Sequence, residues 1–138
     1  MIAQPKPDWM TPDLEMLADT AARFAEKETL PHDERWRQQK HGDRGLWNKA
    51  GAAGMLCASI PEEYGGGGGD FRHDMVILQT WARLMAGGFS NSVHSGIVAQ
   101  YILRYATEVQ KRKYLPKMAT GEMVAAIAMT EPGAGTDL

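Results

Sequence analysis

The sequence ends with AIAMTEPGAGTDL at residues 126–138, and this stretch carries more information about the fold than any other. An apolar run that includes Met129 leads into a turn built around Gly133 and Gly135. Glycine has no Cβ, so the backbone there can approach a flat ring or a phosphate closely. Thr130 and Thr136 flank the turn, and each hydroxyl can donate one hydrogen bond and accept two. Taken alone, the pattern fits a cofactor-binding loop or a tight turn between strands, and tight turns are the commoner.

Residues 123–129 form a continuous apolar run of strand length. A single strand leaves its own backbone donors and acceptors unpaired, and no other part of the sequence has the pattern of a partner strand. We therefore expect this run to be the first strand of a sheet whose other strands lie outside these residues.

The rest of the sequence has the periodicity of helices. Thr11 and Pro12 are suited to the N-cap and the first helical position, and apolar residues then recur every three or four positions to about Glu28. Pro31 is expected to bend or end this helix. Later apolar repeats predict a short helix around Trp36 and further helices at residues 46–54, 72–85, 90–106 and 108–118.

Apolar stripes predict which face of each later helix is buried. In the helix at 72–85 the stripe consists of Met75, Leu78, Ala82 and Met85. In the helix at 108–118 the residues expected to point inward are Val109, Leu115 and Met118.

The helix at 90–106 has two distinct faces. One is an apolar stripe of Val93, Ile97, Tyr101 and Tyr105, and the other consists of the small residues Ser92, Ser95, Gly96 and Ala99. Small residues let another backbone or a slender apolar ligand come close. Ordinary helix packing is the commoner reason for such a face.

Residues 65–69 are five consecutive glycines, which predict a flexible surface connection because glycine loses the most entropy on ordering. Asp70 occupies the place of the last glycine of a dinucleotide fingerprint, and no Gly-Lys-Ser or Gly-Lys-Thr is present to make a phosphate loop.

Composition excludes several classes of protein. The net charge of -2 argues against a nucleic-acid partner, which requires a cationic surface. Cys57 is the only cysteine, and the four histidines lack the spacing of metal ligands. No apolar run approaches 18 residues and no charged-then-apolar leader begins the chain, so we expect neither a membrane span nor a signal peptide. The expected location is the cytoplasm, or the mitochondrial matrix in a eukaryote.

The stretch 126–138 resembles the first signature of the acyl-CoA dehydrogenase family. Residues 59–66, Ser-Ile-Pro-Glu-Glu-Tyr-Gly-Gly, are similar to a loop that this family carries between its early helices. Residues 93–98, 110–116 and 120–122 are spaced as in its helical domain, and the sequence around His94 and Met129 is most similar to the long-chain subgroup.

The resemblance implies a mainly α fold, with the family's N-terminal helical bundle followed by the first strand of its middle β domain. It implies a lead at residues 1–12, a helical domain at 13–121 and the start of the β domain at 122–138. By position in the signature, Met129, Thr130, Gly135 and Thr136 would contact FAD. Thr136 would also approach the CoA part of the substrate, and Ser95 and Gly96 would line the slot for the acyl chain.

The activity implied is α,β-dehydrogenation of a fatty acyl-CoA to the trans-2-enoyl-CoA. A carboxylate removes the α proton and a hydride passes from the β carbon to flavin N5. The family also implies an electron-transferring flavoprotein as partner and a homotetramer. Because the family's catalytic glutamate belongs to a C-terminal bundle absent here, we expect these 138 residues alone to be an inactive piece. Two alternatives stay open, namely an acyl-CoA oxidase of the same superfamily and a helical interaction module without catalysis.

Overall fold

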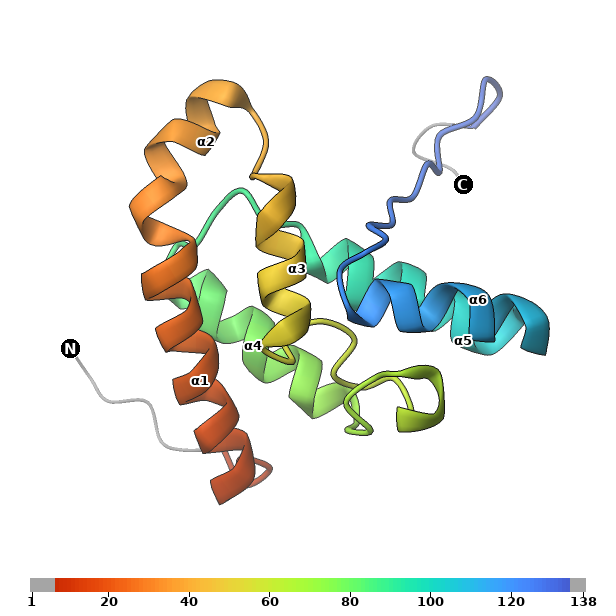
Figure 1. Cartoon of the computed structure of the whole chain (residues 1–138), viewed down its shortest axis with the longest axis horizontal. Coiled ribbons are helices and arrows are strands. Elements are labelled where there is room, and N and C mark those ends of the chain that lie inside the picture. The colour runs from red at the N-terminus through yellow and green to blue at the C-terminus, as the bar shows by residue number, and fades with distance from the viewer. Residues whose placement is uncertain (1–6, 135–138) are drawn as a thin grey trace.

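The computed structural model describes residues 7–134 of the chain and shows two groups of helices, each with its own buried core (Figure 1). The first group contains α1 (Pro12–Glu28), the 3-10 turn η1 (Leu30–His32), α2 (Asp33–Gln39), α3 (Arg44–Ala52) and α4 (Phe71–Arg83). The second contains the 3-10 turn η2 (Glu62–Tyr64), the π-helix η3 (Ser92–Val98), α5 (Ala99–Tyr105) and α6 (Glu108–Ala119). Within residues 7–134, no helix is long and apolar enough to cross a membrane.

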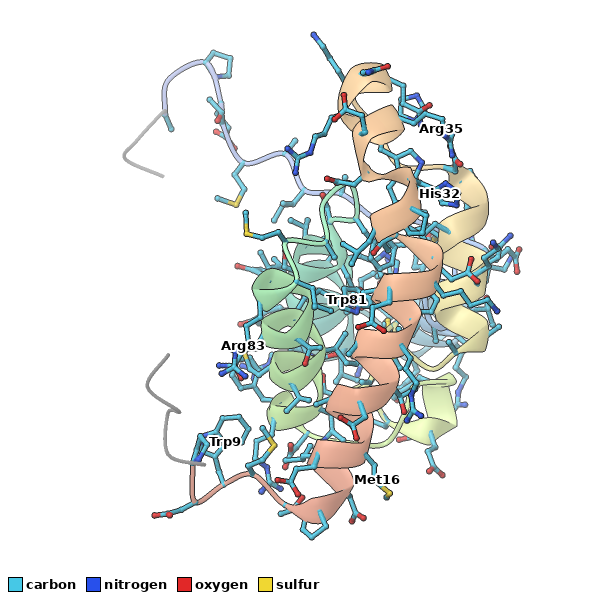
Figure 2. The ribbon with its side chains drawn as sticks, turned by 90° about the vertical axis from the view of Figure 1, so that its left-hand side faces the viewer. Trp9, Met16, His32, Arg35, Trp81 and Arg83 are labelled. Atoms are coloured by element: carbon cyan, nitrogen blue, oxygen red, sulfur yellow. The ribbon has the colours of Figure 1, made fainter. Side chains whose placement is uncertain are left out.

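Helix α1 begins as the sequence predicts. The Thr11 hydroxyl accepts a hydrogen bond from the Leu14 amide, Pro12 occupies the first helical position, and the helix ends at Glu28. Its buried face packs against α4, and the indole N–H of Trp81 donates to the Ala21 carbonyl oxygen at 2.9 Å (Figure 2). The first core is therefore closed by both apolar contact and a buried hydrogen bond.

The buried face of α4 differs from the predicted stripe. Met75 and Ala82 are exposed, Leu78 is half-buried, and Met85 is 74% exposed just beyond the end of the helix. The residues that point into the protein are Val76, Ile77 and Trp81, together with the polar Asp74. The prediction was wrong because it assigned every apolar residue of the repeat, including Met75 and Met85, to the core. It left out Asp74, which is polar but buried.

Helices α5 and α6 lie side by side and form the second core with the loop before η2 (Figure 1). Leu115 and Met118 of α6 are buried as predicted, whereas Val109 is exposed. The helix expected at 90–106 is divided, because its first part, Ser92–Val98, is a π-helix and only Ala99–Tyr105 is α-helical.

The glycine run at residues 65–69 is a folded loop and not the flexible connection expected. Its amides donate to carbonyl oxygens of the preceding segment: Gly66 to Pro61, Gly67 to Cys57, Gly68 to Ile60 and Gly69 to Ala58, at 2.9–3.2 Å. A Cβ at Gly66 would overlap the Ile60 carbonyl oxygen, so the backbone approach requires glycine there. The sequence pattern could not show that a second segment lies so close.

The strand expected at 123–129 does not form within the described residues. Residues 124–130 are irregular in structure, and the next four close a turn in which Glu131 and Ala134 exchange backbone hydrogen bonds of 3.0 and 3.1 Å. The physical reason is the absence of a neighbouring strand, since a lone segment cannot complete a ladder. This segment projects away from the helices (Figure 1).

Candidate functional site

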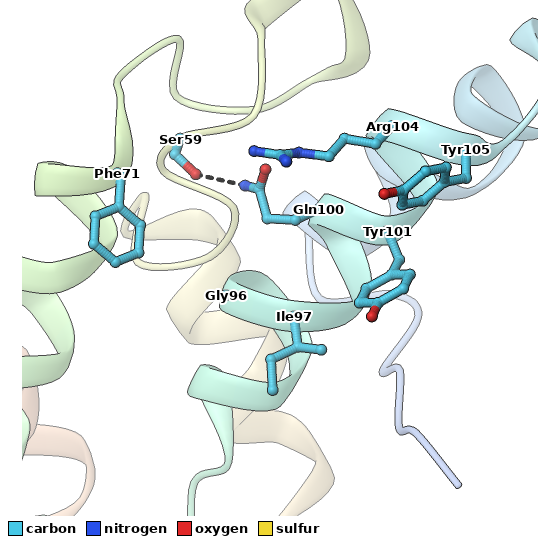
Figure 3. Close-up of a pocket in the computed structure, with 8 residues that line it drawn as sticks. All are labelled: Ser59, Phe71, Gly96, Ile97, Gln100, Tyr101, Arg104 and Tyr105. Atoms are coloured by element: carbon cyan, nitrogen blue, oxygen red, sulfur yellow. Dashed lines mark hydrogen bonds between the residues drawn. The ribbon is translucent and has the colours of Figure 1, made fainter. Parts of the chain in front are cut away.

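A cleft of about 550 Å³ lies between the second helical group and the N-terminus of α4 (Figure 3). Gly96 and Ile97 of η3 and Gln100 and Tyr101 of α5 form one wall. Facing residues come from the loop before η2 and from α4, and the lining is completed by Ser59, Phe71, Arg104 and Tyr105. The cleft thus combines apolar walls with a small number of polar groups, which is typical of ligand sites.

Its polar side is organised by a buried carboxyl group. Asp74 is 3% exposed and accepts a hydrogen bond from the Ser59 hydroxyl. The Ser59 oxygen in turn accepts from the Gln100 side-chain amide at 2.8 Å, as Figure 3 shows. Burial raises the pKa of Asp74, and the Ser59 hydroxyl opposes that shift by favouring the carboxylate. Because the Gln100 nitrogen faces Ser59, its carbonyl oxygen stays available to the cleft.

The structure separates the two residues that the sequence placed on the acyl wall. Gly96 lines the cleft, and a Cβ built there meets no other atom within 4 Å. Ser95 is buried on the opposite side, where its hydroxyl donates to Asn91 Oδ1 at 2.6 Å and accepts from the Cys57 amide at 2.9 Å. The proposed contact of Ser95 with substrate stays a prediction, and its observed role is to join η3 to the loop at Cys57.

His94 is fully buried and connects three segments. Its Nε2 lies 3.1 Å from the Met118 carbonyl oxygen, and the Ala125 amide lies 3.1 Å from Nδ1. A carbonyl oxygen only accepts, so Nε2 carries the proton and Nδ1 accepts from Ala125. The Trp47 ring packs on the imidazole at a centroid distance of 4.9 Å. Burial lowers the pKa of His94, which keeps the ring neutral.

The signature segment is accessible to a ligand. Met129 is 53% exposed, Thr130 is exposed, and a Cβ on Gly133 meets nothing within 4 Å. The backbone amides of residues 126–130 make no hydrogen bond to another described residue. Free amides and an exposed hydroxyl fit the ring carbonyls and nitrogens of a flavin. Gly135 and Thr136 lie outside the described residues.

The family model for the acyl-CoA dehydrogenase N-terminal domain matches residues 11–122. The chain belongs to the acyl-CoA dehydrogenase family. It is 39% identical over 124 residues to the mitochondrial long-chain specific acyl-CoA dehydrogenase of Mus musculus, covering 90% of this chain and 29% of the mouse protein.

Solved structures of acyl-CoA dehydrogenases share the same helical arrangement. The enzyme from Geobacillus kaustophilus superimposes with a TM-score of 0.87 at 39% identity, over 96% of this chain and 35% of that one. The Bacillus anthracis acyl-CoA dehydrogenase complexed with FAD gives a TM-score of 0.86 at 40% identity, over 96% of this chain and 23% of that one. The chain therefore spans about a third or less of each of these relatives.

His94 connects η3, which forms part of the cleft wall, to the residues that lead into the signature. Asp74, Ser59 and Gln100 organise the polar side of the cleft, and neither they nor His94 are among the site residues that the sequence predicts. A signal for two of them was present, because His94 and Asp74 are polar residues within apolar helical repeats. Such positions are buried only when their polar atoms are hydrogen-bonded.

Proposed function

We propose that this chain forms the N-terminal helical domain of a flavin-dependent acyl-CoA dehydrogenase that converts a fatty acyl-CoA to its trans-2-enoyl-CoA. One observation carries the proposal: directly after the region that matches the family, residues 126–130 of the signature segment are exposed and their amides have no described partner. An exposed apolar segment with unpaired backbone groups is costly unless another part of a protein or a ligand covers it.

In this proposal residues 13–121 are the helical domain and residues 122–138 begin the middle β domain. Val124, Ile127 and Met129 are the exposed apolar side chains of the segment. They would be buried, and residues 123–129 would become a strand, when the remainder of a sheet pairs with them.

FAD is the cofactor that we propose for the signature segment, where it would supply the hydride acceptor. Thr130 would hydrogen-bond to the flavin ring through its exposed hydroxyl, and Met129 would pack beside it. Gly135 and Thr136 would approach the pyrophosphate, Thr136 also being near the CoA portion of the substrate. Fixed donors at the ring stabilise the negative charge that reduction brings to it.

The acyl chain would lie along the wall made by Gly96 and Ile97. Among the residues that the structure describes, no carboxylate lines this cleft, so we propose that the base that removes the α proton comes from outside residues 1–138. From membership of the family we propose an electron-transferring flavoprotein as the acceptor and a homotetramer as the assembly. Residues 1–138 alone would then be inactive.

A hybrid enzyme tests the proposal. Residues 1–138 replace the equivalent region of the Geobacillus kaustophilus acyl-CoA dehydrogenase, whose fold they match. We expect about one FAD per subunit and conversion of a saturated long-chain acyl-CoA to the enoyl product with an artificial electron acceptor. The 138-residue chain alone should give neither.

Thr130→Val in the hybrid is the matched control, since valine keeps the shape of threonine and removes the hydroxyl. We expect FAD to bind about tenfold more weakly, the effect of one lost hydrogen bond. A folded hybrid that binds no flavin and no acyl-CoA would favour a non-catalytic interaction module instead. Rapid peroxide formation in air would favour an acyl-CoA oxidase.

A further inference from the structure

Within residues 7–134, the hydrogen bond from the Ala125 amide to His94 is the last one along the chain that joins the signature segment to the helices. Before it, Arg44 donates to the Glu122 carbonyl oxygen at 2.5 Å and the Met123 amide donates to the Lys117 carbonyl oxygen at 2.9 Å. After it, residues 126–130 make no hydrogen bond to another described residue. Ala125 is therefore the point from which the segment leaves the helical domain.

The imidazole of His94 is fixed by a hydrogen bond and a ring contact. Nε2 donates to the Met118 carbonyl oxygen near the end of α6, and Trp47 of α3 packs against the ring. His94 also belongs to η3, in which Gly96 and Ile97 form part of the cleft wall. One rigid side chain thus connects the cleft wall to the start of the signature segment.

We propose that His94 is a positioning residue, which fixes the direction of residues 126–130 through the Ala125 amide and so aligns Met129 and Thr130 with the wall formed by Gly96 and Ile97. The effect of His94 on catalysis rests on the proposed function. Hydride transfer requires the reacting atoms to be about 3–3.5 Å apart, so a small rotation of the segment would separate a cofactor held on it from an acyl chain on the wall. In this proposal His94 itself contacts neither the cofactor nor the acyl chain.

The first test uses amide hydrogen exchange, measured by NMR in the 138-residue chain. In the wild-type chain we expect the Ala125 amide to exchange at least about tenfold more slowly than the Ala126 amide. In His94→Phe, which keeps a ring of similar size without an acceptor, the difference should disappear. In His94→Asn, whose side-chain oxygen lies near the position of Nδ1, it should be largely restored. Equal exchange at Ala125 and Ala126 in the wild-type chain would overturn the inference.

The second test uses the hybrid enzyme and leaves His94 in place, in case His94→Phe does not fold. Ala125→Pro removes the donor, and Ala125→Ser, which keeps the backbone amide and a small side chain, is the matched control. We expect Ala125→Pro to weaken FAD binding and slow flavin reduction at saturating acyl-CoA, each about tenfold, with the acyl-CoA KM changed less than about twofold. Ala125→Ser, which keeps the donor, should have a clearly smaller effect on both.

Equal effects of Ala125→Pro and Ala125→Ser, or a loss confined to KM, would contradict the inference while leaving the proposed function intact. If the wild-type hybrid binds no flavin, the proposed function fails. The exchange experiment in the chain alone still decides whether His94 anchors the segment, and unchanged protection in His94→Phe would refute that role.

Discussion

At the scale of single residues, the loop at 65–69 shows how close backbone contact selects an amino acid. Gly67 is packed so that a Cβ would lie 2.8 Å from the Ala58 carbonyl oxygen, and Gly66 is closer still to Ile60. The neighbouring atoms belong to the backbone, which cannot move aside as a flexible side chain can. Glycine is therefore required at Gly66 and Gly67, because neighbouring backbone atoms leave no room for a Cβ.

Replacing Gly66 by alanine should destabilise the chain by about 2–3 kcal/mol, because its methyl group would overlap the Ile60 backbone. The matched control is Gly45→Ala in α3, where a Cβ meets nothing within 4 Å and alanine is the better helix former. Urea denaturation measures both. A Gly66→Ala variant as stable as the wild type would show that the loop does not dock as described.

Cys57 should be chemically silent in the folded chain. Burial raises the pKa of its thiol to about 12, and the thiolate is the reactive form. An aromatic disulfide reagent at pH 8 should label it rapidly in urea and very slowly in buffer. Fast labelling in buffer, without unfolding, would contradict the buried position.

The same thiol gives a pH dependence whose sign follows from the raised pKa. The unfolded chain loses the Cys57 proton near pH 9 and the folded chain near 12, so the folded state is increasingly disfavoured between these values. The free energy of unfolding should fall with pH in this range more steeply in the wild type than in Cys57→Ala. Chemical denaturation at pH 8, 9 and 10 measures the difference, and parallel curves would refute it.

At the scale of helices, the sequence predicts where a helix begins and how it is capped better than which of its faces is buried. Thr11 and Pro12 define the start of α1 because capping is a local interaction. The buried face of α4 depends on which neighbours surround it, and only the structure shows that Asp74 is accommodated by Ser59. The gap in the site prediction has the same origin, since the partners of His94 lie 24 and 31 residues away.

The corrected face of α4 can be tested by truncation. Ile77→Ala should cost about 2–5 kcal/mol because Ile77 is fully buried in the first core. Met85→Ala should change stability by less than about 0.5 kcal/mol, because that side chain is exposed. If thermal or urea unfolding shows the larger loss for Met85, the originally predicted stripe is the buried one.

The start of α6 provides a local test. The Thr107 hydroxyl accepts from the Gln110 amide at 3.3 Å, and the Gln110 side chain accepts from the Thr107 amide at 2.9 Å. Thr107→Ala removes the cap and should reduce the free energy of unfolding by about 1 kcal/mol, whereas Thr107→Ser should retain most of it. Equal losses for the two variants would show that the hydroxyl is not a cap.

At the scale of the whole molecule, two helical cores are complete while the segment after them is not. Sequence periodicity predicted the helical domain, because its stabilising contacts lie within these residues. It also predicted a strand at 123–129, but strand formation requires a partner strand, and residues 7–134 contain none. In the proposed function, the exposed segment and the cleft are two parts of one catalytic site.

The measurement that tests this account most directly is an anaerobic titration of the hybrid enzyme with a saturated long-chain acyl-CoA. We expect the visible absorbance of the bound flavin to bleach in proportion to acyl-CoA added, with the trans-2-enoyl-CoA as product. A hybrid that is folded and carries flavin, yet keeps its full absorbance at saturating acyl-CoA, would contradict the account.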